Sequence, residues 1–295
     1  MNALSERRKG ELHIFVGSVM WAFFPIIVVL SYASVGSLTS LAWSTAIATL
    51  FFAGIMTARD RWHEIWSVRL WKDAFMIALF IGVLFYGLYY AGLETSTPGN
   101  ASIIVLFEVF TSIVFFRVCK GERLSLEYAI GAILMVVGAL IILSRGFSGI
   151  HIGDLYILMA TLFAPAGNFY QQKAREIASS ESIMFLRSAL SVPPLFILAY
   201  VLGENVSFQG IFLSLPFLMI NGVLMLGLTK LLWIEGIHRI SVTKATALGS
   251  IAPFFTLFFA WLILQQAPTI WQLLSLVPFV LGTLLLTDQW TLKRI

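Results

Sequence analysis

The sequence predicts an all-α membrane protein with ten transmembrane helices, arranged as two inverted five-helix repeats with both termini in the cytoplasm. Three observations predict this fold class: the composition, the distribution of lysine and arginine, and an internal repeat. Of 295 residues, 59% are hydrophobic and 12% are charged, whereas soluble domains have roughly 45–50% apolar and about 25% charged residues. A bilayer accommodates the surplus, because its hydrocarbon core of about 30 Å accepts helices of roughly 20 apolar residues.

Ten apolar segments follow one another along the chain, with short connections between them. Strict alternation of apolar and polar residues is absent, so helices are expected to satisfy the backbone hydrogen bonds in lipid. The first segment is too long for the apolar core of a cleavable signal peptide. The expected helices lie near residues 14–34, 37–57, 72–93, 97–117, 125–144, 153–172, 182–202, 211–235, 243–264 and 268–287.

Lysine and arginine are distributed unequally between the two sides that these helices define. With the N-terminus inside, sixteen of the nineteen fall in cytoplasmic segments, and only Arg145 falls on the opposite side. The other two, Arg187 and Lys230, lie within predicted helices. Cytoplasmic loops of membrane proteins carry such an excess of positive charge. The count therefore predicts cytoplasmic termini and agrees with ten crossings.

A shift of 144 residues aligns the first half of the chain with the second. Gly92 then falls on Gly236 and Gly138 on Gly282, in a register that holds across three predicted helices. Because five is an odd number, the second copy crosses the membrane in the opposite direction to the first. Transporters recurrently have such inverted repeats, with the substrate near the midplane at the repeat interface. The predicted repeats are residues 11–145 and 150–288.

Two ionisable residues lie inside predicted helices and break the repeat symmetry. Glu108 aligns with Ala252, and Lys230 aligns with Tyr86. Because a charge within the membrane is costly, such residues generally mark a functional site. We expect Glu108 to couple protons or bind a substrate amine, and Lys230 to be its counter-charge or to bind a substrate carboxylate. The structural alternatives are a buried ion pair, or a Lys230 side chain that extends to the cytoplasmic interface.

Aromatic and amide side chains supply further candidates. Tyr86, Tyr89 and Tyr90 share one helix face, and such rings offer stacking surface to aromatic amino acids or amphiphilic drugs. Helix packing and anchoring at the membrane interface are the structural alternatives. Arg187 lies about two turns into its predicted helix, and we interpret it as an anchor near the cytoplasmic surface. The predicted substrate-binding or coupling residues are Glu108, Lys230, Tyr86, Tyr89, Tyr90, Trp21, Asn168 and Trp233.

Enzymatic motifs are missing from the sequence. It has no Walker loop for ATP-driven pumping, no HExxH motif and a single cysteine, Cys119, so a metal site of these kinds is not expected. No basic surface with interleaved aromatic residues indicates nucleic-acid binding. We therefore expect a protein that is not an enzyme and has neither cofactor nor metal.

Corresponding stretches of the two halves resemble a known family. The first half has Leu88-Tyr89-Tyr90-Ala91-Gly92-Leu93, then Ala101, Phe110, Gly121-Glu122-Arg123 and a helix from Gly131 to Gly138. The second half has Leu232-Trp233-Ile234-Glu235-Gly236, then Ala245, Pro253, Gln265-Gln266 and Gly282. Over essentially the whole chain, this pattern resembles the drug/metabolite transporter (DMT) superfamily, specifically proteins with two EamA-type domains.

The sequence departs from the family pattern at identifiable positions. Val109 stands where a proline is usual, although Pro253 keeps the proline in the second half. Trp43 stands where an arginine is common, and Arg187 keeps that arginine. The resemblance implies export of amino acids, metabolites or toxic compounds, while distant relatives exchange nucleotide sugars or phosphorylated sugars. It leaves the substrate of this chain open.

The sequence thus predicts a secondary active transporter, and specifically an exporter, in the plasma (inner) membrane of a bacterium. Expected substrates are small metabolites such as amino acids, or amphiphilic drugs. The expected partners are that substrate, membrane lipid and a proton as coupling ion, without nucleic acid. Two other classes stay open: a flippase for lipids or lipid-linked headgroups, and a non-transporting membrane assembly factor. Glu108 and Lys230 argue against the assembly factor, which has no need of charges within the membrane.

Overall fold

The computed structural model describes residues 5–32, 34–120, 126–144, 151–204 and 207–286, and in these ranges it contains helices and no strand. The predicted Gly121-Glu122-Arg123 motif and Arg145 lie outside the described residues. In chain order the elements are α1 (Glu6–Trp21), α2 (Phe24–Ser31), α3 (Ser37–Ala58), η1 (Trp62–Trp66), α4 (Val68–Ile77), η2 (Ala78–Phe85), α5 (Tyr86–Leu93), α6 (Pro98–Ile104), α7 (Phe107–Lys120), α8 (Leu126–Ser144), α9 (Ile152–Ala160), α10 (Ala164–Ala174), α11 (Ser180–Val201), α12 (Phe208–Ile220), η4 (Asn221–Leu228), α13 (Thr229–Arg239), α14 (Val242–Gly249), α15 (Ala252–Leu264) and α16 (Ile270–Leu286).

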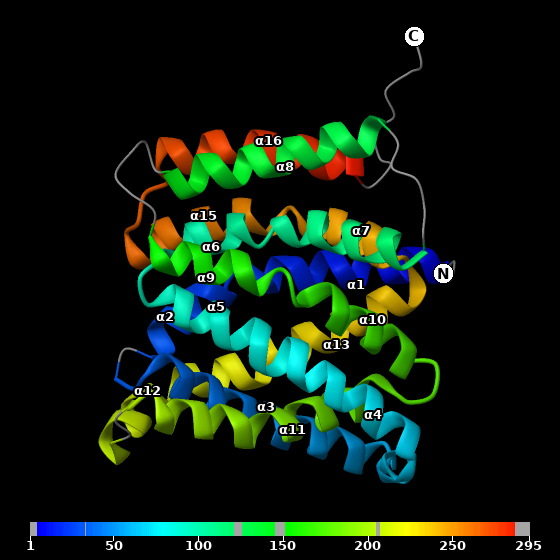
Figure 1. Cartoon of the computed structure of the whole chain (residues 1–295). Helices are drawn as coiled ribbons and strands as arrows, with labels where there is room; N and C mark the ends of the chain where they lie inside the picture. The colour runs from blue at the N-terminus through cyan, green and yellow to red at the C-terminus, as the bar shows by residue number, and fades with distance from the viewer. Residues whose placement is uncertain (1–4, 33, 121–125, 145–150, 205–206, 287–295) are drawn as a thin grey trace.

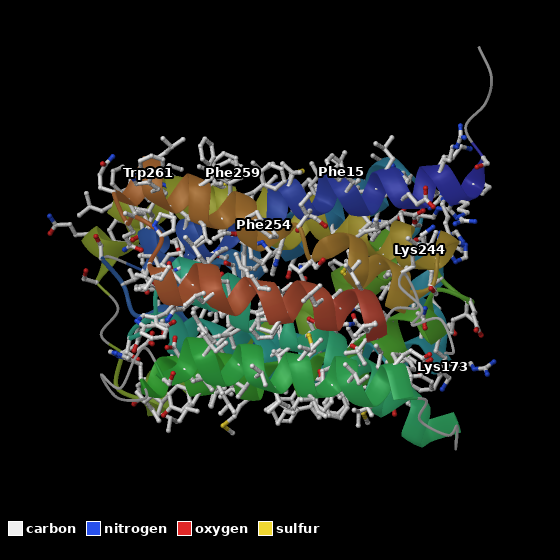
Figure 2. All side chains as sticks on the ribbon, turned by 90° about the horizontal axis from the view of Figure 1, so that it is seen from above. Phe15, Lys173, Lys244, Phe254, Phe259 and Trp261 are labelled. Carbon is white, nitrogen blue, oxygen red and sulfur yellow. The ribbon has the colours of Figure 1, made fainter. Side chains whose placement is uncertain are left out.

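The helices form one bundle, with α8 and α16 along one edge and α3 and α11 along the opposite edge (Figure 1). Within the described residues, seven helical stretches are long and apolar enough to cross a membrane, and three shorter apolar helices accompany them. Phe15, Phe254 and Trp261 are about half exposed on one flank (Figure 2), which suits contact with lipid. The prediction of an all-helical, multi-pass membrane protein is confirmed. The number of ten crossings and the cytoplasmic termini stay predictions.

In the described part of the chain, four of the predicted helices are broken near their centres. The breaks separate α1 from α2, α6 from α7, α9 from α10 and α14 from α15. Proline lacks a backbone N–H and disrupts a continuing helix, and it begins the second piece of three of them as Pro25, Pro165 and Pro253. The α6–α7 break has no proline and is a tight turn, in which Glu108 N donates to Val105 O at 2.9 Å.

The two halves repeat one another in local structure. The π-helical segments η2 and η4 begin 143 residues apart, at 78 and 221. Helix α1 packs on α13 as α9 packs on α5. Equivalent glycines lie at both contacts, Gly10 against Gly236 and Gly153 against Gly92. A Cβ atom at Gly153 would lie 2.2 Å from the Gly92 carbonyl oxygen, so this helix pair is in backbone contact.

Equivalent helices of the two halves run in opposite directions. Lys173, in the last turn of α10, pairs with Asp73 near the start of α4 (3.2 Å). Arg175, just after α10, pairs with Glu235 near the end of α13 (3.1 Å). Thus α4 begins at the end of the bundle where α13 finishes. The third and eighth predicted helices are antiparallel, as an inverted repeat requires.

Basic side chains gather at one end of the bundle. Figure 2 shows Lys173 and Lys244 at the end where α1 begins, and Lys244 pairs there with Glu11. The opposite end holds Asp154 and Glu204, which accept hydrogen bonds from other loops and helices. The basic end is therefore the one that the positive-inside bias assigns to the cytoplasm.

Two glutamates join the repeats reciprocally through helix N-termini. After α3, Glu64 Oε2 accepts a bond from the backbone N–H of Ser179, the N-cap residue of α11 (2.7 Å). After α11, Glu204 accepts bonds from Leu38 N (2.9 Å) and Thr39 N (2.7 Å) in the first turn of α3. Carboxylates at these positions satisfy N–H groups that have no helical partner and interact favourably with the helix dipole. Each repeat thus stabilises a helix of the other.

Removing these carboxylates is expected to destabilise the bundle. Glu64→Ala and Glu204→Ala should each cost about 1 kcal/mol, the usual effect of losing a helix cap. The two effects should add, because the residues lie at opposite ends of the α3–α11 pair. Apparent melting temperatures of the purified variants in detergent measure this. Strong non-additivity in the double variant would contradict independent caps.

The contribution of Glu64 to the stability of the folded protein should also depend on pH. Burial alone raises the pKa of this carboxyl, but hydrogen bonds from Ser179 and Ser182 outweigh burial and hold the pKa below its ordinary value. The stabilisation is therefore fully present above the pKa of the unfolded chain, about 4.3, and is lost as pH falls through the lower folded value. Accordingly, the melting-temperature difference between wild type and Glu64→Ala should shrink below about pH 4. A difference unchanged by acid would contradict this.

Candidate functional site

A cavity of about 150 Å³ lies between the two halves. Its lining includes residues at all four helix breaks: Trp21, Val105, Ala164 and Ala252. Breaks free backbone groups and change helix direction, and membrane proteins tolerate them where they line a cavity or are covered by protein. The breaks that the two repeats share therefore converge on one internal space.

The cavity brings together most of the residues predicted from the sequence. Its lining contains Trp21, Tyr86, Tyr89, Glu108, Asn168, Lys230 and Trp233. Tyr90 is not part of the lining, and its hydroxyl accepts a hydrogen bond from the Asn221 amide in the α5–η4 contact. Of the three tyrosines on this helix face, Tyr86 and Tyr89 therefore line the cavity, whereas Tyr90 packs between the two halves.

Glu108 owes its position to the α6–α7 break. It is the second residue of α7, half-buried at the N-terminus of that helix. Its Oε1 accepts a hydrogen bond from Asn168 Nδ2 of α10 at 2.9 Å, and Asn168 is buried. A carboxylate at a helix N-terminus is favoured by the dipole and by the unpaired N–H groups. The break therefore makes an acid inside the membrane less costly.

Lys230 is the second residue of α13, just after η4, as Tyr86 is the first residue of α5, just after η2 in the other half. Its Nζ lies 3.3 Å from the centre of the Trp21 ring and 5.7 Å from that of Tyr86. An ammonium over a ring face is stabilised by the negative charge of that face, by up to about 2 kcal/mol away from water. Among the described residues Lys230 has no ion pair, so the predicted alternative of a direct Glu108–Lys230 pair is not found there.

Arg187 is a cavity residue that the sequence analysis interpreted differently. We expected an anchor near the cytoplasmic surface, but the side chain is 1% exposed and lines the cavity. Helix α11 is covered by η1 and α4 at this end, so its second turn already lies in the interior. The Cζ atom is 5.5 Å from the Tyr86 ring centre, and Nε and Nη1 have no hydrogen-bond partner. The sequence signal that could have identified Arg187 as a cavity residue was its charge within an apolar segment, the same signal that identified Lys230.

Aromatic rings form one wall of the cavity. Phe24 stacks on Trp21 (ring centres 3.9 Å apart) and on Tyr89 (5.3 Å), and meets Tyr86 edge to face at 5.8 Å. Trp21, Tyr86 and Tyr89 reach the lining, while Phe24 is fully buried behind them. This packing fixes the rings, so they present a preformed apolar surface.

A polar network closes the acidic end of the bundle. Asn100 donates to Asp154 Oδ2 (3.1 Å) and accepts from Gln272 Nε2 (2.8 Å), and Ser96 also donates to Asp154. These residues join α6, α9 and α16, which belong to both halves. The cavity lining reaches Gln171, in the last turn of α10, toward the basic end, and Ser102 of α6 toward the network.

No group of three or more His, Cys, Asp or Glu side chains that could hold a metal ion is present among the described residues. The cavity lining contains one acid, two cations, amide and hydroxyl side chains, and aromatic rings.

Comparison with known proteins identifies the class to which this architecture belongs. The model of the EamA-like transporter family matches residues 8–144 and 151–288. The uncharacterized transporter YvbV of Bacillus subtilis is 27% identical over 256 residues, covering 81% of this chain and 83% of that protein. An uncharacterized transporter of Methanothermobacter thermautotrophicus is 22% identical over 302 residues, covering 96% and 88%.

A solved structure supports the fold. It is a crystal structure of a protein 17% identical to this chain, with a TM-score of 0.67, and the match covers 94% of this chain and 95% of the other. At this identity the likeness concerns the fold alone. The two segments matched by the family model confirm the resemblance predicted from the sequence: this multi-pass membrane protein belongs to the EamA-like transporter family.

Proposed function

We propose that the protein is a secondary active transporter that exports small metabolites across the plasma membrane of a bacterium, with ten crossings and cytoplasmic termini. The observation that carries this proposal is the cavity at the four helix breaks, which contains Glu108, Lys230 and Arg187. Substrate sites near the midplane, at the interface of inverted repeats and beside broken helices, are characteristic of secondary transporters. Glu108 is the residue proposed to carry the coupling proton.

The size of the cavity supports small substrates. At about 150 Å³, it equals an engineered protein cavity that binds benzene. Pockets for drug-sized ligands have roughly 300–1,000 Å³. A metabolite of the size of an amino acid fits this conformation, whereas an amphiphilic drug requires the cavity to expand.

The position of the cavity supports export. Its lining reaches Gln171 toward the basic end, and the Asn100–Asp154–Gln272 hydrogen bonds join helices of both halves at the other end. If the basic end is cytoplasmic, as the charge bias predicts, this conformation loads substrate from the cytoplasm. Rocking of the two halves about the cavity would then release it outside.

A transport assay tests the proposal against the flippase and assembly-factor alternatives. Inside-out vesicles from cells that produce the protein are supplied with a proton gradient and labelled amino acids, and parallel vesicles receive a fluorescent lipid. Expected is accumulation of a soluble metabolite that a protonophore abolishes, with no change in lipid flipping. Faster lipid flipping without solute accumulation would indicate a flippase. The transport proposal would be overturned if neither vesicle assay shows a gain and the metabolite and drug-sensitivity profile of producing cells is unchanged.

A further inference from the structure

Positively charged side chains outnumber negatively charged ones in the cavity lining. Two cationic side chains, Arg187 and Lys230, line it, and among its described lining residues the one carboxylate is Glu108. Glu108 is engaged by Asn168, which donates to its Oε1 at 2.9 Å. In their ordinary ionisation states, these three groups leave one positive charge in excess.

The two cations both lie close to a single aromatic ring. The Tyr86 ring centre lies 5.5 Å from Arg187 Cζ and 5.7 Å from Lys230 Nζ. The two cations therefore lie on one wall of the cavity. They come from α11 and α13, two helices that contact each other. Like charges in such proximity repel one another, and the repulsion is stronger in a low-dielectric interior than in water.

Arg187 has unused hydrogen-bonding capacity. Its side chain is 1% exposed, and its Nε and Nη1 atoms have no hydrogen-bond partner. A buried cation without an anion to pair with is destabilising. A guanidinium presents its N–H groups as a planar fork that fits a carboxylate with two parallel bonds. An arriving carboxylate would accept a hydrogen bond from one of these donors and neutralise the excess charge.

We propose that Arg187 and Lys230, both beside the Tyr86 ring, form an anion subsite for the carboxylate of a small monoanionic substrate. This deepens the proposed transport function and rests on it. The substrate's apolar, planar body lies on the ring wall of Trp21, Tyr86 and Tyr89. The carboxylate is the group that is recognised; a substrate amine, where present, is secondary and faces Glu108.

Charge and volume together select a monoanion. One added negative charge balances the set of Arg187, Lys230 and Glu108, whereas a dianion would be repelled by Glu108. A cation would add to an existing excess of positive charge. Because the cavity has about 150 Å³, the substrate body is limited to roughly the size of one aromatic ring.

Three probes of equal size and shape test the charge requirement: benzoate, benzamide and benzamidine. Each is added at millimolar concentration to the purified full chain in lipid nanodiscs, and the apparent melting temperature is recorded. Benzoate is expected to raise it, because a ligand that binds only the folded state stabilises that state. Neutral benzamide and cationic benzamidine are expected to leave it unchanged.

Variants assign the effect to Arg187. Arg187→Gln should weaken benzoate binding by about tenfold or more, the loss expected for a charged hydrogen-bonding partner. Arg187→Lys should retain part of the affinity, because it keeps the charge and loses the fork. Arg69→Gln removes the same charge from an exposed position and should bind benzoate like wild type.

The outcomes distinguish this inference from the proposed function. Stabilisation by benzamidine but not by benzoate, no benzoate effect on wild type, or undiminished benzoate binding by Arg187→Gln would each overturn the anion subsite, even if transport is measured. If Arg187→Gln does not fold, the wild-type comparison of the three probes and the Arg187→Lys variant still decide. Benzoate binding without transport in vesicles would retain the subsite and overturn the transporter proposal.

Discussion

Replacing Glu108 by glutamine is expected to reduce proton-driven transport to the rate of empty vesicles while the protein still folds and inserts. Glutamine keeps the shape and the acceptor for Asn168 Nδ2, which donates to Glu108 Oε1 at 2.9 Å in the wild type. The change in stability should therefore stay within about 1 kcal/mol. Glutamine cannot release a proton, however, so coupling through this side chain is lost.

Lys230→Met should cause a comparable loss of transport. Methionine conserves the apolar stem over Trp21 but removes the ammonium, which lies 3.3 Å from the centre of that ring. Transport is measured in proteoliposomes with an imposed pH gradient, using a substrate found by metabolite profiling. Glu176→Gln and Lys72→Met change the same charges at exposed positions and serve as matched controls with wild-type rates. Wild-type rates in both cavity variants would remove these residues from the mechanism.

Among the helical glycines discussed above, Gly153 is the one whose replacement by alanine is expected to destabilise the protein most. The added methyl group would lie 2.2 Å from the Gly92 carbonyl oxygen and 2.5 Å from Thr95 Oγ1, so the α5 and α9 backbones must separate. Overpacking of this kind costs about 1–3 kcal/mol. Gly236→Ala should cost less, because its methyl group would meet the Ile14 side chain, which can rotate away.

Gly54 provides the matched control for this prediction. A methyl group there has no atom within 4 Å, so Gly54→Ala should be neutral or stabilising by up to about 1 kcal/mol, since alanine is the better helix former. Thermal unfolding of the variants in one detergent compares them directly. Equal melting temperatures for Gly153→Ala and Gly54→Ala would show that the α5–α9 contact is looser than its glycines indicate.

Much of the fold could be predicted from the sequence because its causes are local or additive. Apolar composition requires burial in lipid, and long apolar segments such as α3 (Ser37–Ala58) require helices. Gly92 and Gly236, which the 144-residue offset aligns, lie at equivalent helix contacts, Gly92–Gly153 and Gly236–Gly10. The helix break at Glu108 was not predicted, because no proline marks it and its turn depends on packing.

The residue types of the candidate site could be predicted from the sequence, but the contacts between these residues could not. Glu108 and Lys230 are conspicuous because ionisable groups are rare inside apolar segments, and the cavity contains both. Their partners could not be deduced: Asn168 holds Glu108, and the Trp21 ring holds Lys230. Such contacts join residues far apart in the chain.

By itself the sequence determined the membrane environment, the helical class, the duplication and the residue types available for chemistry, since these follow from composition, periodicity and register. The tertiary structure decided where the side chains lie. It moved Arg187 from an expected surface anchor to a buried cavity wall with unpaired donors, and it assigned Tyr90 to the packing between the halves. The physical reason is that burial depends on which helices cover a position, and α11 is covered by η1 and α4. Local sequence does not encode that arrangement.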